Sequence, residues 1–193
     1  MAGTAALNGV QSHYDIVMGL LSDLGFLMMA FFMWLEDRFT HKIDTRVTTF
    51  PIKKGMTVID YGCGPGRYTI RYASLVGSQG QVYAVDIHHL AITSVEKKAK
   101  KAGYDNIRPV LATGNDSGLP DGIADLITAI DMIFGVDEPE ELLKELHRLL
   151  KEDGILIIDD NHRSRSKTRS LIARSGLWII TEDHPDHITC TPI

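Results

Sequence analysis

Short apolar segments alternate with segments of helical spacing along most of the chain, from residue 56 onward. Five of the apolar segments are rich in Val and Ile, and Gly, Asp or Pro residues bound them, as in β-strands. The seven predicted strands are 56–62, 80–87, 106–112, 124–130, 154–160, 177–183 and 187–193. The four predicted helices between them are 67–76, 90–103, 138–154 and 166–176. Such alternation predicts an α/β fold, in which a parallel sheet carries helices on both faces.

An apolar segment precedes this pattern and runs from Ile16 to Leu35. It has twenty residues, of which only Asp23 is charged, and so reaches the length of a membrane span. No Lys or Arg comes before it, which argues against a signal peptide, and Asp23 argues against a span. We expect a helix that covers an active site or packs on the domain, with contact to a membrane surface as the first alternative and a true membrane span as the least favoured one.

The length, composition and charge of the chain limit the fold and the partners that it can have. The chain has 193 residues, of which 44% are hydrophobic and 23% charged, and this suits one globular domain behind an N-terminal helical region. The net charge of −5 gives no general attraction to nucleic acid, and the basic run 163–170 fits a solvated loop or first helical turn. Cys63 and Cys190 lack CxxC spacing, so a reducing cytoplasm is the expected location.

The turn after the first predicted strand has the form acid-x-Gly-x-Gly-x-Gly, from Asp60 through Gly62 and Gly64 to Gly66. In a doubly wound sheet this turn lies where a ligand binds, and glycines let the ligand approach the backbone. A dinucleotide fingerprint counted from Gly62 would need a glycine at position 67, where Arg67 stands. An acid here suits a ligand with a cationic tail, so an NAD(P)-dependent oxidoreductase is the less favoured interpretation.

With these residues the chain resembles the class I S-adenosylmethionine-dependent methyltransferases, in particular the small-molecule, type 11/25-like branch with a DxGCGxG loop. The resemblance covers residues 55–193. It implies a Rossmann-like, doubly wound, seven-stranded sheet that is mostly parallel, with the last strand antiparallel. Residues 1–50 would form a helical cover or lid, and residues 51–193 the S-adenosylmethionine-binding domain. The loop along the methionine part of the cofactor would contain Asp60, Gly62, Cys63, Gly64 and Gly66.

Two further segments match the family's cofactor site. Asp86, at the end of the second strand, resembles the acid that accepts both ribose hydroxyls, and Ile87 would then lie against the adenine. The segment 114–120, GNDSGLP, resembles the family's G-D-A-x-x-L-P loop, whose acid meets the adenine amino group. Asn115 stands in the place of that acid and Asp116 follows it, so either side chain can accept the hydrogen bond from the adenine amino group.

The catalytic residues are less defined, because methyl transfer from a sulfonium is an in-line displacement that needs positioning more than acid–base groups. The catalytic candidates lie at strand ends and in the N-terminal cover, and they are His162, Tyr14 and Asp131. His88 and His89 also follow a strand, but a capping or surface role is favoured for them. Asp131, Asp160 and Asn161 resemble the Mg²⁺ ligands of catechol-type O-methyltransferases, but a role as helix caps and loop acids is favoured, and no metal is expected.

The expected activity is therefore methyl transfer from S-adenosyl-L-methionine to a small acceptor. Because the N-terminal region is rich in Met, Phe and Leu, an apolar or lipid-like acceptor is favoured over protein or nucleic acid. The alternatives are a Mg²⁺-dependent catechol-type enzyme and a binding module without transferase activity. Membrane-surface contact through the segment from Ile16 to Leu35 would add membrane association to the cytoplasmic location.

Overall fold

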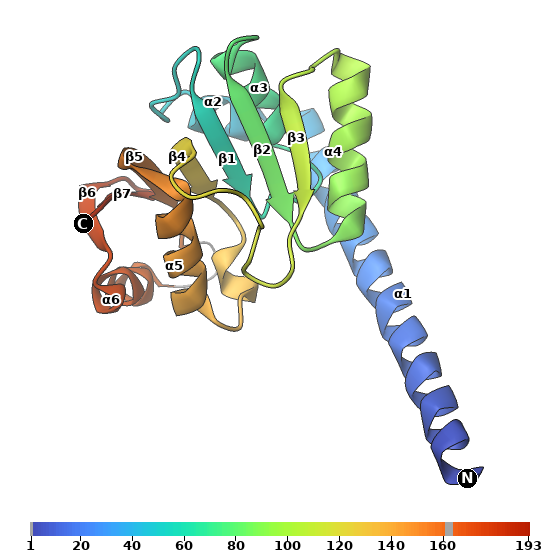
Figure 1. Ribbon diagram of the computed structural model, residues 1–193. Coiled ribbons are helices and arrows are strands. Elements are labelled where there is room, and N and C mark those ends of the chain that lie inside the picture. Colours follow the sequence, from blue (N-terminus) through green and yellow to red (C-terminus); the bar gives the residue numbers. More distant parts are fainter. Residues whose placement is uncertain (1, 161–163) are drawn as a thin grey trace. The chain divides into compact units, whose positions relative to one another are not determined.

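The structure is a computed structural model that describes residues 2–160 and 164–193 (Figure 1). The chain divides into two compact units, Met1–Lys42 and Ile43–Ile193. The first unit contains one continuous helix of 38 residues, α1 (Ala2–Phe39), whose side chains are described from Met18 onward. The second unit contains the sheet and the remaining helices, and each unit is described separately.

The second unit is built on a seven-stranded sheet with the order β3-β2-β1-β4-β5-β7-β6. Strands β1 to β5 pair in parallel, whereas β7 is antiparallel to both β5 and β6. Because β1 lies between β2 and β4, the strand order reverses there, and this reversal marks the ligand-binding edge of doubly wound sheets. The strands are β1 (Thr57–Tyr61), β2 (Gln81–Asp86), β3 (Ile107–Leu111), β4 (Ala124–Ala129), β5 (Leu150–Ile158), β6 (Trp178–Asp183) and β7 (Ile188–Pro192).

Helices pack along this sheet, in agreement with the alternating sequence pattern (Figure 1). α3 and α4 pack on β1, β2 and β3, while α5 and α6 pack together beside β5 and β6. Four leucines of α5 are fully buried and join the side chains of the central strands in one apolar core. The helices are α2 (Lys42–Val47), α3 (Thr69–Val76), α4 (His89–Ala102), α5 (Pro139–Leu149) and α6 (Arg165–Ser175), with a 3-10 turn at Ile133–Gly135.

The predicted fold class is confirmed, including the seven strands and the antiparallel last strand. The predicted helix 138–154 is too long, because α5 ends at Leu149 and β5 begins at Leu150. Leu150 is already extended, with ψ of 142°, and pairs with Ala124 of β4. The following Gly154 lies so close that a Cβ there would come within 2.5 Å of Leu150 Cγ. The segment therefore continues the sheet through an irregular stretch of pairing with β4.

The predicted division into a cover, residues 1–50, and a cofactor-binding domain, residues 51–193, stays a prediction. The two compact units are divided between Lys42 and Ile43. The reason is that α2 belongs to the sheet-containing unit, where its side chains Ile43 and Val47 are buried together with Phe50. The N-terminal region is thus a single helix, and the short α2 positions side chains within the second unit.

Candidate cofactor and acceptor site

The loop after β1 depends on three glycines with left-handed backbone conformations. The φ angles are +73° at Gly62, +51° at Gly64 and +83° at Gly66, a region that side chains disfavour. A Cβ at Gly62 would lie 2.7 Å from Met132 Cβ, and one at Gly66 would lie 3.0 Å from Val95 Cγ2. A Cβ at Gly64 would meet no atom within 4 Å. Two glycines therefore let the loop pack against its neighbours, while the third presents bare backbone to open space.

Asp86 holds this loop from the end of β2. Its Oδ2 accepts a hydrogen bond from Gly64 N at 2.8 Å, and its Oδ1 accepts one from His88 N at 2.8 Å. A carboxylate oxygen has a second lone pair, so each of the two oxygens can still accept a hydrogen bond from a ligand hydroxyl. Ile87, the next residue, is 68% exposed and offers an apolar surface beside the carboxylate. Acceptors for a diol and a surface for a flat ring thus lie together at the end of β2.

Asp60, by contrast, is turned into the protein. It is 2% exposed, and its carboxylate accepts hydrogen bonds from Thr69 Oγ1 at 2.5 Å and from Thr128 Oγ1 at 3.4 Å. Burial raises the pKa of Asp60 to about 7, the bond from Thr69 lowers it, and the charge of Asp86 raises it. Because Asp60 is buried, a cationic tail has no open path to its carboxylate, and its contact with the cofactor stays a prediction.

Cys63, the other predicted loop residue, is buried, with 6% of its surface exposed. Burial and the carboxylates of Asp60 and Asp86 raise the pKa of its thiol. A thiol in such surroundings stays protonated and unreactive. Cys63 therefore contributes to the loop through packing and through its backbone N–H, which donates to Val85 O at 3.0 Å.

The loop that contains Asn115 and Asp116 is fixed from two sides. The Tyr61 hydroxyl donates to Asn115 O at 2.6 Å, and Asn115 Nδ2 donates to Glu138 O at 3.2 Å. The Asp116 carboxylate instead accepts from Gly118 N at 2.8 Å, within its own turn. The side-chain oxygen of Asn115 and the second carboxylate oxygen of Asp116 can both still accept a hydrogen bond from an amino group, so the owner of the adenine contact stays a prediction.

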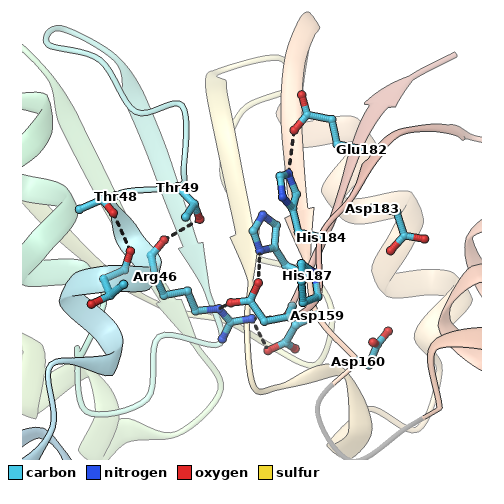
Figure 2. Close-up of polar contacts among 12 residues, drawn as sticks. Arg46, Thr48, Thr49, Asp159, Asp160, Glu182, Asp183, His184 and His187 are labelled. Carbon is cyan, nitrogen blue, oxygen red and sulfur yellow. Dashed lines mark hydrogen bonds and ion pairs between the residues drawn. The ribbon is translucent and has the colours of Figure 1, made fainter.

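A buried polar network lies at the carboxyl end of β5 (Figure 2). Arg46 of α2 donates from Nη2 to Asp159 Oδ2 at 3.1 Å and from Nη1 to the Tyr68 hydroxyl at 3.1 Å. Its Nε lies 3.0 Å from Asp186 Oδ2 in the β6–β7 connection. The side chains of Arg46 and Asp159 are 8% and 3% exposed. One guanidinium therefore joins α2, the end of β5, the β6–β7 connection and the start of α3.

The same network positions Asp131. Asp159 Oδ1 accepts a hydrogen bond from Asp131 N at 3.0 Å. Asp131 has a φ angle of +58°, the one positive value at a non-glycine position in the part of the chain that the structure describes. Burial and the charge of Asp131 raise the pKa of Asp159, while Arg46 lowers it. The next residue, Met132, packs on Gly62, so the turn after β4 connects this network to the glycine loop.

His187 extends the network toward β7. Its ring is almost fully buried, and Nδ1 lies 2.9 Å from Asp186 Oδ1. The ring packs edge-on against Phe50 and stacks on His184 with the centroids 4.3 Å apart. Burial lowers the pKa of His187, and the neighbouring Asp186 partly offsets this. Figure 2 also shows His184 paired with Glu182, 2.7 Å away.

The remaining candidates are placed as follows. Asp160 Oδ2 pairs with Arg165 Nε, while its Oδ1 is buried and has no hydrogen-bond partner among the described residues. Asn161 and His162 lie outside the described residues, and of Tyr14 only the backbone, within α1, is described. The candidate metal set of Asp131, Asp160 and Asn161 and the catalytic candidates therefore stay predictions.

His88 has the capping role that was favoured for it. Its backbone is extended, and its Nδ1 accepts a hydrogen bond from Leu90 N at 3.3 Å at the start of α4. Its ring stacks on that of His89, with the centroids 5.2 Å apart. In the basic run 163–170, Arg165 and Arg169 lie in the first turns of α6 and both pair with Asp183. Their charge is thus partly neutralised within the fold.

Comparison with known proteins identifies the family. A family model described as a methyltransferase domain matches residues 52–184. The chain belongs to the class I S-adenosylmethionine-dependent methyltransferases. This assigns S-adenosylmethionine as the cofactor, in preference to NAD(P). The bare backbone at Gly64 and the two oxygens of Asp86 fit such a cofactor, because a Cβ would fill the space at Gly64 and a ribose diol needs two acceptors.

Relatives of this methyltransferase include quinone-modifying enzymes. A demethylmenaquinone methyltransferase of Geobacillus kaustophilus is 26% identical over 148 residues, which cover 77% of this chain and 58% of the relative. A ubiquinone/menaquinone biosynthesis C-methyltransferase of Citrobacter koseri is 28% identical over 152 residues, which cover 78% and 55%. The chain thus spans little more than half the length of these relatives. A SAM-dependent methyltransferase structure from Aquifex aeolicus matches with a TM-score of 0.67 at 24% identity, covering 78% of this chain and 88% of that one.

Proposed function

We propose that this methyltransferase transfers the methyl group of S-adenosylmethionine to a small, apolar, lipid-like acceptor. The observation that carries the proposal is the pairing of open backbone at Gly64 with the Asp86 carboxylate, which is bonded to that same backbone. Asp86 is proposed to accept the ribose hydroxyls, Ile87 to lie against the adenine and Asn115 or Asp116 to accept from its amino group. The bound cofactor supplies the methyl group and its positive charge.

The residues of the second unit are proposed to act mainly by positioning. An in-line displacement needs the acceptor atom held behind the methyl group and water kept away, and both requirements are geometric. Asp131 is the catalytic candidate best placed among the described residues. It lies two residues after the end of β4 and next to Met132, which packs on Gly62. The buried Arg46–Asp159 pair is proposed to hold Asp131 in its left-handed conformation.

The acceptor class is inferred from two sources. The relatives named above act, by their names, in ubiquinone and menaquinone synthesis, and one is a C-methyltransferase. Large apolar side chains also crowd the N-terminal helix of this chain. A demethylated quinol with a short prenyl tail is therefore the acceptor to test first. Because the chain spans only part of those relatives, the acceptor stays a proposal.

Thermal-shift and turnover measurements test this function. We expect S-adenosylhomocysteine to stabilise the protein and NAD(P) to leave it unchanged, since ligands raise the melting temperature only where they bind the folded state. We expect methyl transfer from labelled S-adenosylmethionine to a short-chain demethylmenaquinol. Stabilisation without transfer to any of a panel of quinols and catechols would instead support a binding module, and stabilisation by NAD(P) alone would contradict the proposal.

Two roles compete for the N-terminal helical region. As a cover, it would close the acceptor side of the second unit, and deletion of residues 1–40 would abolish transfer but leave cofactor binding measurable. As a membrane contact, it would leave transfer to a dispersed acceptor intact on deletion and remove only the association with lipid. The exposed side chains of α1 support the second role.

A further inference from the structure

Most of the exposed large apolar side chains that the structure describes lie on a single helix. Of the seventeen described, twelve belong to α1, between Met18 and Phe39, and Phe32 and Trp34 are 61% and 59% exposed. Within Met18–Phe39, Phe26 is the one buried residue. Exposed apolar surface on this scale marks a site of interaction, because folded proteins in water rarely display it.

The apolar side chains are not confined to one stripe of the helix. At 100° per residue, Leu20, Leu24, Leu27 and Phe31 lie on one side, while Phe26 and Met33 lie on the opposite side. A helix that packs on a protein surface needs only one apolar face. A helix that is apolar on nearly all sides suits surroundings that are apolar in every direction.

The length of the segment fits a lipid bilayer. Met18–Phe39 has 22 residues, and it is long and apolar enough to cross a membrane. At about 1.5 Å per residue it extends about 33 Å, close to the thickness of about 30 Å of the hydrocarbon core. All of it is helical, so its backbone groups are satisfied internally, as a bilayer requires. Ser22 and Asp23 lie in the second turn of the segment, away from its middle.

Charge on the two sides of the segment is unequal. The seventeen residues before Met18 contain no Lys or Arg. After Trp34, the chain carries Arg38, Lys42, Arg46, Lys53 and Lys54 within about twenty residues, together with the acids Glu36, Asp37 and Asp44, and Arg46 is buried. Basic residues near the end of a span stay on the cytoplasmic side, where anionic lipids also attract them. The aromatic residues of the segment gather in its second half, and Trp and Tyr favour membrane interfaces.

We propose that Met18–Phe39 spans an anionic bilayer, with the basic flank and the methyltransferase unit on the cytoplasmic side and the residues before Met18 on the opposite side. This arrangement goes beyond the proposed function and does not depend on the acceptor. If the acceptor is a lipid-like quinol, the span keeps the enzyme at the membrane in which the quinol is dissolved.

Membrane extraction tests the span. In bacterial cells that express the full chain, we expect the protein in the membrane fraction after an alkaline carbonate wash. The double variant Leu27→Lys/Phe31→Lys should move to the soluble fraction and still bind S-adenosylhomocysteine with parental affinity. The matched control is Leu75→Lys/Ile179→Lys, which alters two exposed apolar residues of the second unit and should stay in the membrane fraction.

Other occupants of the apolar surface give different results. A soluble parental chain would overturn the proposal. If that soluble chain were a dimer that the double variant converted to a monomer, the helix would pair with a second copy. If it were a monomer whose double variant lost transfer to a dispersed acceptor, the helix would be a cover. Because cofactor binding is measured in parallel, these outcomes are separate from failure of the proposed function.

Cysteine labelling tests the orientation. Ser12→Cys, before the span, should react in intact spheroplasts with a maleimide that does not cross membranes. Ser78→Cys, in an exposed turn of the second unit, should react only after lysis. The two native cysteines are buried and serve as the background. The reverse pattern, or equal labelling of both positions, would overturn the proposed orientation.

Discussion

Replacing Arg46 by methionine should destabilise the second unit strongly and in a pH-dependent way. Methionine keeps an unbranched apolar stem but removes the guanidinium that faces Asp159, Asp186 and Tyr68. Breaking a buried ion pair from one side costs about 3–5 kcal/mol, because a buried charge is left without compensation. Asp159 sets this cost, since its side chain is 3% exposed, whereas that of Asp186 is 52% exposed and keeps its contact with water.

The pH dependence follows from the protonation of Asp159. Burial and Asp131 raise the pKa of Asp159, and loss of Arg46 removes the group that lowers it. A neutral Asp159 needs no cationic partner, so the cost of Arg46→Met should be largest at pH 8 and smaller at pH 5. Urea unfolding of a Trp34→Phe background, followed by the fluorescence of Trp178, measures both values.

A double-mutant cycle provides the control. Once Asp159→Asn removes the charge, Arg46→Met should cost at least about 2 kcal/mol less than it does alone, because contacting groups are not additive. A cost below about 1 kcal/mol at pH 8, or one that is equal at both pH values, would refute a charged, buried pair. An additive cycle would show that the cost of losing Arg46 does not arise from its pairing with Asp159.

Three further predictions concern the loop, Asp60 and the metal question. Gly64→Val should abolish binding of S-adenosylhomocysteine in calorimetry. The control Gly122→Val, at a glycine with a similar φ of +60° and equally open space, should bind normally. Parental affinity in Gly64→Val would disprove the proposed loop geometry. The pKa of Asp60 is raised to about 7, so the stability that it contributes is full below about pH 4 and declines as the pH rises to 7. Relative to Asp60→Asn, the parental protein should lose up to about 4 kcal/mol of unfolding free energy over that range, at about 1.4 kcal/mol for each pKa unit, and a constant difference in urea unfolding would contradict this. Chelation by EDTA should leave methyl transfer unchanged, and loss of transfer that Mg²⁺ restores would favour the catechol-type alternative.

The sheet could be predicted from the sequence because its signals are local. Val- and Ile-rich segments separated by helical patterns specify the order of strands and helices, and the glycine spacing after Asp60 specifies the ligand-binding turn. The end of α5 was missed because the segment LLKEDG continues the helical spacing, whereas its pairing with β4 is decided by tertiary contacts.

The polar network could not be predicted in the same way. Arg46 and Asp159 are 113 positions apart, and no local pattern connects them. The sequence drew attention to Asp160. Just after β5, however, it is Asp159 that pairs with Arg46, while Asp160 pairs with Arg165. The left-handed backbone at Asp131 likewise depends on a distant hydrogen-bond acceptor. Two adjacent acids at the end of a strand indicate a polar site, but the sequence does not show which of the two side chains faces that site.

Calorimetric titration of S-adenosylhomocysteine into the parental protein and Asp86→Ala tests the central claim most directly. The parental protein should bind, and Asp86→Ala should bind at least about thirtyfold more weakly, a loss of about 2 kcal/mol, because the ribose hydroxyls and Gly64 N lose a charged acceptor. Circular dichroism confirms that the variant is folded. Equal affinities for the two proteins, or no binding by the parental protein, would contradict the assignment of this edge of the sheet as the cofactor site.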